Sequence, residues 1–499
     1  MSDPSWLLPT LVGLPILAAV VPLLVGRRVD GVGWVVAAIV GIVHLAMAGA
    51  LASRVLDAGP VVHELGGFPA PIGIVLIADE LSALLVLLVG AVATGVLAYT
   101  RRGGPRGWSF YSVYLLLLAG LSGMGLTGDL FNLFVFLEIT GIATYALIAA
   151  RPAPPAAMAA LKYLIVGTVG ATFYLIGVGL LFGATGTLNM ADMAASLAGG
   201  GSARLGVLYD SPLVIAGFGF IVAGLGTKIA LFPLHTWQPD AYAEAHDGVS
   251  ILVAALGGTT AAYALLRVVV DVFTVDFFAV VPAARWVLIG IGSVSVVAGS
   301  ALAAIQRRPK RLFAYSSVSH LGLVVAAVGV AVGPGGGYYA LLGAIVHLLG
   351  HAVVKGGLFA GAGVLAAETG ARSIEEYAEL GRRHPVPAAT VAVLGLALVG
   401  VPPSVGFVGK WFIAIGALEA GVPVVAALVV GMTLLTLAYV ARVIERLYVV
   451  PRPAIEGALA ADGGGRSASL GMVAAAVVAT VVAVGLGLLG GPFEAALAP

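Results

Sequence analysis

The chain has 499 residues, of which 60% are hydrophobic and only 10% are charged, against roughly 25% charged residues in ordinary soluble domains. Together with a mean hydropathy of +1.09, this composition indicates a membrane protein, and a net charge of +1 without a basic tail gives no reason to expect a nucleic-acid partner. The chain has no cysteine, which excludes thiolate-held iron–sulfur clusters, disulfides and thiol catalysis, and we expect no cofactor.

Fourteen apolar segments are long enough to cross about 30 Å of hydrocarbon, which predicts an all-α polytopic membrane protein. The first, residues 6–26, is too long and too rich in proline for a cleaved signal peptide, so we expect it to be retained. The other spans are predicted at residues 32–52, 78–99, 108–127, 129–149, 160–184, 211–236, 248–270, 284–305, 311–332, 338–366, 386–415, 422–448 and 470–490.

Basic side chains are unevenly distributed over the predicted connections. Most of the 25 Lys and Arg residues fall after odd-numbered spans, and those on the other side are Arg54, Arg204, Arg267 and Arg285. Cytoplasmic connections carry the excess of Lys and Arg. We therefore expect a multi-pass protein of the cell membrane with both termini outside and the lipid bilayer as its surroundings.

The fifth span contains a deeply placed carboxylate in the stretch GDLFNLFVFLEITG. Glu138 lies nine residues after Asp129, about two and a half helical turns into the membrane. A carboxylate at this depth needs a cation, and Lys228 is equally deep and equally short of a partner. The alternative is a packing role with a hydrogen bond to a neighbouring hydroxyl.

Lys228 lies in the apolar seventh span, which is then interrupted in the stretch GLGTKIALFPLHTWQPDA. A central lysine costs roughly +2.5 to +3.5 kcal/mol of insertion free energy, so its ammonium should face protein or water. Pro233 and Pro239 cannot donate to the helical ladder, and such a break is tolerated at membrane depth only where the freed backbone lines a protein cavity. A broken helix beside a buried charge predicts an ion path.

The eleventh span carries three titratable groups on one helix face, in the stretch HLLGHAVVKGG. His347, His351 and Lys355 are spaced at i, i+4 and i+8, which predicts a relay. His320, in the tenth span, is alone on an apolar face, and either a packing or a relay role fits it. A metal site at the histidine pair is not favoured because no nearby Cys, Asp or Glu completes a ligand set.

A second broken helix is predicted in the twelfth span, GVPPSVGFVGKWF, just before the buried Lys410. Interrupted helices five spans apart indicate two inverted five-helix repeats, spans 4–8 and 9–13, with broken helices 7 and 12 and an ion site in each. The predicted organisation is a three-helix N-terminal segment (1–107), a first repeat forming the entrance half-channel (108–270), a second forming the exit half-channel (271–448), and a C-terminal loop with the last helix (449–499).

Several stretches together resemble the proton-conducting antiporter-like family, over about residues 79–446: GDLFNLFVFLEI, ALKYLIVGTVGATFYLIGVGLLFGATGTLN, TKIALFPLHTWQPDA, KRLFAYSSVSHLG, HLLGHAVVKGGLFAGAGVL and GVPPSVGFVGKW. That family includes large subunits of Mrp-type sodium/proton antiporters, antiporter-like subunits of respiratory complex I and relatives in membrane-bound hydrogenases. GDLFNLFVFLEI is most similar to the Mrp D subunit and its hydrogenase counterparts.

The resemblance implies fourteen helices with outward termini and a set of site residues. Glu138 and Lys228 would be the paired charge of the entrance half-channel, His347 and His351 the central relay, and Lys410 the lysine of the exit half. Further candidates for the relay are Thr259, His320, Lys355 and Lys162.

Two departures from the family's pattern stand out. Where many relatives have a lysine in the eighth span, this chain reads Thr259 in TTAAYALLR, so one group of the usual relay is neutral. The turn after the seventh span reads AEAHDG, and His246 and Asp247 either line a proton entrance or form a solvated turn. His235 and Asp240 in the broken segment are further candidates for the entrance.

Three functions fit this sequence. The first is a D-type proton-translocating subunit of a multisubunit Na+/proton antiporter, the second a pump subunit of a redox-driven complex such as a hydrogenase or complex I, and the third a scaffold subunit that conducts nothing. All three require other membrane subunits as partners, and the first two transport protons and, in the antiporter, Na+. The chain shows no nucleotide-binding motif, so an ion gradient or a redox partner must supply the energy.

Overall fold

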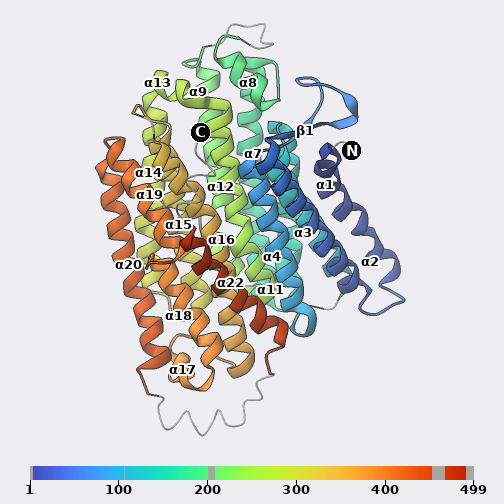
Figure 1. Ribbon diagram of the computed structural model, residues 1–499, viewed down its shortest axis with the longest axis vertical. Coiled ribbons are helices and arrows are strands. Elements are labelled where there is room, and N and C mark those ends of the chain that lie inside the picture. The colour runs from blue at the N-terminus through green and yellow to red at the C-terminus, as the bar shows by residue number, and fades with distance from the viewer. Residues whose placement is uncertain (1–3, 106, 201–207, 336, 452–466, 490–499) are drawn as a thin grey trace.

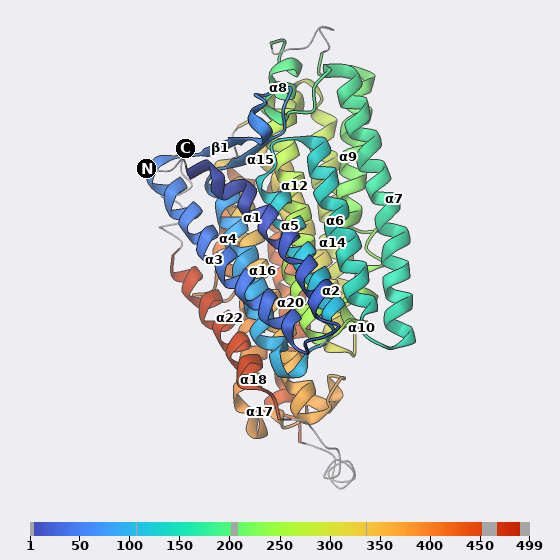
Figure 2. The same ribbon diagram turned by 90° about the vertical axis from the view of Figure 1, so that its right-hand side faces the viewer.

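The computed structural model describes residues 4–105, 107–200, 208–335, 337–451 and 467–489. The described chain is almost entirely helical, and most helices run side by side along the long axis of the molecule (Figure 1, Figure 2). Thirteen of the described helices are long and apolar enough to cross a membrane. A further apolar segment is divided between two shorter helices, α18 (Pro385–Val399) and α19 (Val405–Glu419), so the predicted all-α polytopic fold is confirmed.

The N-terminal segment holds three spans and a small hairpin. The first span bends into α1 (Leu7–Ala18) and α2 (Val20–Val25), and α3 (Val32–Ala58) and α4 (Glu80–Gly103) follow. Between α3 and α4, β1 (Val61–Glu64) pairs antiparallel with β2 (Val75–Ala78). Each strand has only four residues, the shortest alternation that indicates a strand, and neither strand is among the elements predicted from the sequence.

The first predicted repeat contains five spans, of which the last two are irregular. The eighth span is interrupted by two π-helical segments, η3 and η4, that flank α12. In chain order the elements are α5 (Trp108–Leu126), α6 (Leu130–Ala149), α7 (Pro154–Thr185), α8 (Met190–Leu197), α9 (Pro212–Ile229), α10 (Gln238–Glu244), α11 (Asp247–Leu252), η3 (Val253–Gly257), α12 (Gly258–Arg267) and η4 (Val268–Phe273). The eighth span continues past the predicted boundary at residue 270 into α13 (Thr274–Val280).

The second predicted repeat contains long, regular helices around one break. Its elements are α14 (Pro282–Ala304), α15 (Pro309–Ala331), α16 (Tyr338–Thr369), η5 (Glu375–Tyr377), α17 (Leu380–Arg383), α18, α19 and α20 (Pro423–Tyr448). The last span, α22 (Leu470–Leu488), belongs to the predicted C-terminal segment, whose residues 452–466 and 490–499 lie outside the described part of the chain.

Both predicted helix breaks are present. Residues 230–237 separate α9 from α10, and residues 400–404 separate α18 from α19. The chain leaves α9 through Ala230, which has a φ of 67°, and leaves α18 through Gly400, which has a φ of +90°. Each break also contains one cis X–Pro peptide bond.

Corresponding helices of the two predicted repeats pack in the same pairs. α5 packs against α6 and α7 against α9, while α14 packs against α15 and α16 against α19. Two related five-helix units would give this pairing. The assignment of residues 108–270 and 271–448 to such units stays a prediction.

The interior of the bundle is formed by α15, α16 and the span from α11 to α13. In the most apolar 18-residue stretch of α16, 94% of the residues are buried, against 17% in the corresponding stretch of α22. The outer helices α3, α20 and α22 present exposed leucine and valine side chains. Lipid is the natural surrounding for those helices, and the interior helices carry most of the polar groups described next.

Candidate functional site

The two buried charges of the first half form an ion pair. Lys228, at the end of α9, places its Nζ 3.2 Å from Glu138 Oε1 on α6. It also donates to the Tyr145 hydroxyl at 3.2 Å. The lysine side chain is 5% exposed and that of Glu138 is 25% exposed. The predicted juxtaposition is therefore present, with Tyr145 as a partner that was not among the predicted site residues.

The break after α9 is held by bonds from its own side chains and neighbours. Trp237 Nε1 donates to the Thr227 carbonyl at 3.0 Å, and the Phe232 N–H donates to Ser295 Oγ at 2.9 Å. Free backbone groups at membrane depth must be satisfied inside the protein. The α9 end also places the negative end of the helix dipole near the Lys228 ammonium, which stabilises its charge.

Four side chains from three helices meet in the centre of the bundle. His320 on α15 and His347 on α16 are joined by a hydrogen bond of 3.1 Å between Nδ1 and Nε2. One turn along α16, His351 Nδ1 lies 3.5 Å from the hydroxyl of Thr259 on α12. All four side chains are buried. We call Thr259, His351, His347 and His320 the central relay.

His320 therefore belongs to this cluster, although the sequence left its role open. Its ring stacks on that of His347, with 5.2 Å between centroids, and lies 6.2 Å from that of His351. The second ring nitrogens of all three histidines are buried without a hydrogen-bond partner among the described residues, so each is open to a further donor or acceptor. Within the described residues, no group of three or more His, Asp and Glu is placed to hold a metal ion.

Two buried lysines flank the central relay in the second half. Lys355 donates to the Phe313 carbonyl at 2.9 Å and to the Ser316 hydroxyl, and its side chain is fully buried. Lys410 on α19 donates to the carbonyls of Val399 at 2.9 Å and Leu398 at 3.2 Å, at the C-terminal end of α18. Among the described residues neither lysine has a carboxylate partner.

Close helix contacts connect these groups. A Cβ at Gly409 would lie 2.7 Å from His347 Cβ, so only glycine allows α19 to bring Lys410 this near the relay. On the other side, a Cβ at Gly258, which precedes Thr259, would lie 3.8 Å from the Ile229 carbonyl oxygen at the end of α9 and 3.9 Å from Gln238 Nε2. The fully buried Gln238, whose amide donates to the Tyr242 hydroxyl at 3.1 Å, lies at the same junction. Its place inside the predicted break is the sequence signal that could have identified Gln238.

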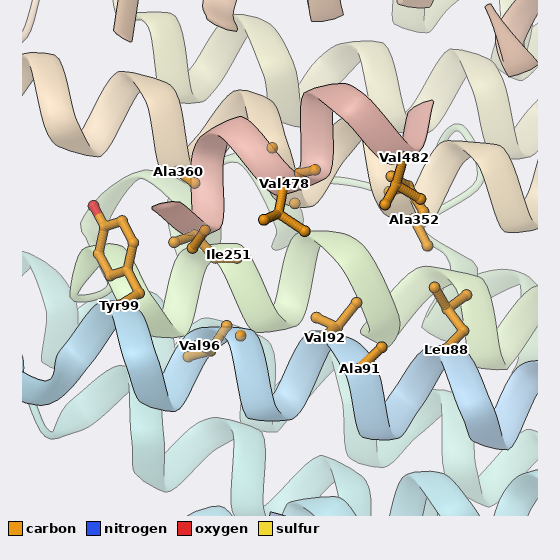
Figure 3. Close-up of a pocket in the computed structure, with 16 residues that line it drawn as sticks. Leu88, Ala91, Val92, Val96, Tyr99, Ile251, Ala352, Ala360, Val478 and Val482 are labelled. Carbon is orange, nitrogen blue, oxygen red and sulfur yellow. The ribbon is translucent and has the colours of Figure 1, made fainter. Parts of the chain in front are cut away.

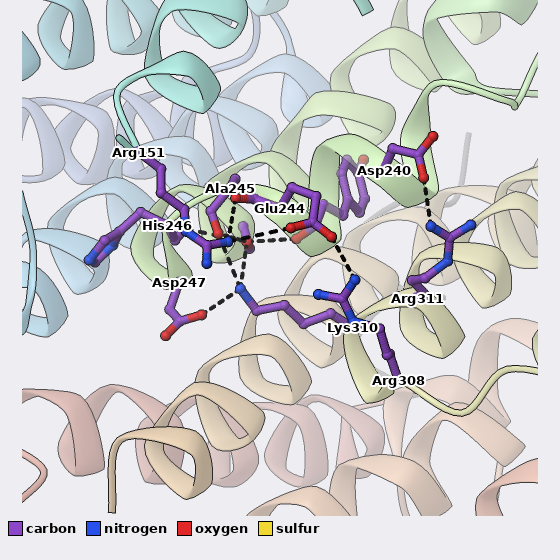
Figure 4. A network of polar contacts seen from close by, with 11 residues as sticks. Arg151, Asp240, Glu244, Ala245, His246, Asp247, Arg308, Lys310 and Arg311 are labelled. Carbon is purple, nitrogen blue, oxygen red and sulfur yellow. Dashed lines mark hydrogen bonds and ion pairs between the residues drawn. The ribbon is translucent and has the colours of Figure 1, made fainter. Parts of the chain in front are cut away.

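Asp240 and Asp247, two of the four residues predicted as an entrance, lie in a network of ion pairs between α10–α11 and the start of α15 (Figure 4). Asp240 binds Arg311 at 2.6 Å and Lys162 at 2.8 Å. Asp247 pairs with Lys310. Further pairs in this network join Glu244 to Arg308 at 2.6 Å and to Arg151 at 3.6 Å. We call this set of residues the charge network.

The charge network changes the interpretation of three candidates. Lys162, a candidate for the relay, binds Asp240, and its part in a relay stays a prediction. Asp247 is not a freely solvated turn residue, because its side chain is 21% exposed and paired with Lys310, while His246 caps α11 by accepting from the Gly248 N–H at 3.3 Å. His235 is buried and stacks on Phe232, outside the network.

Asp240 has a perturbed pKa for a clear electrostatic reason. Burial alone would raise the pKa of its carboxyl, but the hydrogen bonds and positive charges of Lys162 and Arg311 outweigh burial and lower it below the ordinary value. Asp240 is therefore ionised at neutral pH and acts as a fixed anion between α7 and α15.

An apolar cavity of about 180 Å³ lies on another side of α16, between α4, α11 and α22 (Figure 3). It is lined by Ala352, Val353 and Gly356 of α16 and by aliphatic residues of its neighbours. The Tyr99 hydroxyl, at one end, is the polar side-chain group of this lining. An apolar lining offers nothing to hold a chain of water, whereas the α12 and α15 side of α16 carries the buried polar groups described above.

A buried ion pair, a broken helix and titratable groups at bilayer depth define an antiporter-like membrane protein. The chain belongs to the family described as "NADH:quinone oxidoreductase/Mrp antiporter, TM", whose model matches residues 127–436. It is thus a member of a family of proton-translocating membrane subunits, and the resemblance drawn from the sequence is confirmed.

Relatives of both kinds named in the family description are similar to the chain. It is 39% identical over 493 residues to NADH-quinone oxidoreductase subunit N of Desulforudis audaxviator, covering 95% of each chain. It is 32% identical over 404 residues to the D subunit of a Na+/H+ antiporter of Bacillus subtilis, covering 80% of this chain and 78% of that one. In the Mrp complex from Dietzia sp., one chain matches with a TM-score of 0.87 at 27% identity, covering 100% of this chain and 96% of that chain. These similar proteins are subunits of larger assemblies, and the prediction that this subunit works with other membrane subunits is confirmed.

Proposed function

We propose that this subunit translocates protons through two half-channels joined by the central relay. The observation that carries the proposal is the Lys228–Glu138 ion pair, buried at 3.2 Å beside a broken helix. A charge pair at this depth is costly to maintain and is typical of proton pathways. The pair is followed along the bundle by Thr259 and the three histidines, and then by Lys410.

The proposed step begins with separation of the ion pair. While Glu138 is near, the ammonium of Lys228 is stabilised; when the two separate, a buried cation loses its counter-charge and releases its proton toward Gln238 and Thr259. The histidines then pass it on, because a neutral imidazole accepts a proton at one nitrogen and donates at the other. One charge crossing 100 mV gains about 2.3 kcal/mol, comparable with the energy of rearranging one such pair.

The half-channels are assigned from the position of the charges. Residues 108–270 would form the entrance half, with the charge network near its inner mouth, and residues 271–448 the exit half, with Lys410. Because the network is rich in arginine, the positive-inside rule puts its end of the molecule in the cytoplasm and both termini outside.

For the complex in which the subunit works, we propose a multisubunit Na+/proton antiporter, with this chain as its D-type subunit. The match to a chain of the Mrp complex over 100% of this chain supports it. A redox-driven complex is the second candidate, supported by the 39% identity to subunit N of an NADH-quinone oxidoreductase. The two candidates share the same proton path and differ in what drives it.

Purification of the native complex through an affinity tag on this subunit separates these candidates. Mass spectrometry should find only membrane subunits for an antiporter, and iron–sulfur, nickel or flavin subunits for a redox enzyme. Vesicles containing the antiporter should acidify or alkalinise in response to a Na+ gradient, whereas the redox complex should respond only to its electron donor. Absence of proton movement under both drives would favour the non-conducting scaffold.

A further inference from the structure

We propose that the cavity between α3, α4 and the start of α22 binds an anionic phospholipid. The cavity has a volume of about 510 Å³. Arg101, Arg102 and Ser469 line its polar part, and Trp34, Ile42 and Leu97 are among the residues of its apolar part. Such a division matches a phosphate headgroup and an acyl chain. The proposal is independent of the proton path.

The two arginines are available to bind a phosphate. Both are exposed at the end of α4, and none of the ion pairs among the described residues includes either of them. Arg151, Arg308 and Arg311 of the charge network, by contrast, are each bound to a carboxylate. Two neighbouring guanidinium groups without counter-ions are suited to the bidentate binding of a phosphodiester.

Trp34 fixes the position of one guanidinium at the edge of the cavity. The Arg101 guanidinium lies 5.0 Å above the Trp34 ring, and Trp34 Nε1 donates to the Leu97 carbonyl at 2.9 Å. The ring is therefore held in one orientation, and the stacked guanidinium keeps its N–H groups at the edge free for hydrogen bonds. Tryptophan is also enriched at the depth of lipid headgroups.

The start of α22 adds a third positive element. A Cβ at Gly471 would lie 2.3 Å from the Ala98 carbonyl, so glycine is required for the helix to begin this close to α4. Ser469 caps the helix by accepting from the Met472 N–H. The partial positive charge of the α22 N-terminus thus lies beside Arg101 and Arg102.

The rest of the cavity distinguishes a lipid from a free anion. Beyond the arginines, the walls continue along α3 and α4 through Ala38, Ile42 and Leu97. An acyl chain placed there would cover apolar surface, which inorganic phosphate cannot do. The arginines follow an odd-numbered span, so the positive-inside rule puts them at the leaflet whose anionic lipids attract basic residues.

Lipid retention by the purified complex tests the proposal. Native mass spectrometry would count phosphatidylglycerol molecules bound to the parent complex, to the Arg101→Gln/Arg102→Gln variant and to Arg27→Gln/Arg28→Gln. The last pair is a matched control, since both arginines are exposed, Arg27 stacks on Trp108 at 5.3 Å, and neither lines the cavity. We expect about 25-fold weaker phosphatidylglycerol binding in the first variant, from about fivefold for each basic side chain, and no change in the control.

Equal retention of phosphatidylglycerol by the two double variants would overturn the proposed binding site, because the general positive charge of the surface would then explain the binding. A second variant, Ala474→Leu, fills the apolar part and should also release phosphatidylglycerol while both arginines remain. Unchanged retention there would contradict an acyl chain in this cavity. Stabilisation of the complex by inorganic phosphate to the same extent as by phosphatidylglycerol vesicles would show a free anion site instead.

A single introduced cysteine distinguishes lipid from a protein neighbour. The natural chain has no cysteine, so Ile42→Cys, at a 59% exposed position of the cavity wall, is the only thiol in this subunit. In the intact complex this thiol should react with a membrane-soluble maleimide and should be protected by added phosphatidylglycerol but not by phosphatidylcholine. A cross-link from this position to another subunit would overturn the lipid assignment.

Discussion

Lys228 and Lys410 lie at the two helix breaks, yet the protein stabilises their charges by different means. Lys228 ends the helix before its break and pairs with the carboxylate of Glu138. Lys410 lies in the helix after its break and donates to the carbonyl groups of Val399 and Leu398. One lysine has an opposite charge, and the other has only neutral partners, namely these two carbonyl groups and the Thr433 hydroxyl at 3.4 Å.

This difference gives the two halves different roles. An ion pair has two states, joined and separated, and therefore can gate proton release. The carbonyl groups at the end of α18 are fixed by the backbone and the Thr433 hydroxyl is neutral, so Lys410 has no counter-charge that can leave. We infer that control resides in the first half and that Lys410 passively accepts and delivers the proton.

The largest expected effect is loss of transport when the ion pair is broken. Glu138→Ala leaves the buried Lys228 ammonium without its counter-charge, which typically costs 3–5 kcal/mol for a buried pair. Proton uptake by vesicles containing the whole complex should disappear, while part of the complex still assembles. The matched control is Glu419→Gln, at the exposed end of α19. Transport at the parental rate by Glu138→Ala would contradict a gate in the first half.

Lys410→Met should also stop transport but should spare stability, and this contrast sharpens the comparison. Its carbonyl partners stay at the end of their own helix, and no opposite charge is left behind. The melting temperature of the Lys410→Met complex should therefore be at least that of the parent, and above that of Glu138→Ala. A lower melting temperature for Lys410→Met than for Glu138→Ala would reverse the roles assigned to the two lysines.

Replacement of a relay histidine should lower transport strongly without loss of protein. Glutamine keeps a hydrogen bond but cannot carry a proton as imidazole does. His347→Gln and His351→Gln should each reduce the rate of proton uptake, and His320→Gln should do the same because of its 3.1 Å bond to His347. His44→Gln, a buried histidine bonded to Ser122 outside the relay, is the control. Poor assembly with normal activity per complex would indicate a packing role instead.

Replacement of Thr259 should slow transport without abolishing it, because this residue contributes a hydroxyl and not a charge. Thr259→Val is nearly isosteric and removes the 3.5 Å contact with His351, so proton uptake should slow severely while the fold is retained. Thr259→Lys restores the residue usual among the proteins that this sequence resembles and should be tolerated or activating. Equal rates for the parent and Thr259→Val would mean that the proton route does not pass α12.

Much of this arrangement could be predicted from sequence because membrane burial leaves few explanations for a charge. The spacing of His347, His351 and Lys355 was sufficient to place them on one face of one helix. The depth of Glu138 and Lys228 was sufficient to pair these two residues across neighbouring helices. The bond of His320 to His347 depends on the approach of α15 to α16, which no local pattern specifies. For the same reason the chain alone could not show that Lys162 binds Asp240, or that Gln238 lies beside Gly258 of α12.

The smallest expected effect concerns Asp240, which joins the two halves at the charge network. The pKa of its carboxyl is lowered in the folded protein, so its pairing contributes stability above the ordinary carboxyl pKa of about 3.9. This contribution is lost as the pH falls below that value and through the lowered pKa. Because Asp240 and Lys162 are partly exposed, solvent screening limits the contribution to about 1 kcal/mol or less.

Thermal melting of the whole complex between pH 7 and pH 3 measures this contribution. Asp240→Asn should lower the melting temperature slightly near pH 7, and the difference from the parent should shrink as the pH falls below the ordinary carboxyl pKa and toward the lowered pKa of Asp240. Asp57→Asn, on α3 outside the charge network, serves as the control. A difference that is constant with pH would show that Asp240 holds α7 and α15 together through hydrogen bonds and not through its charge.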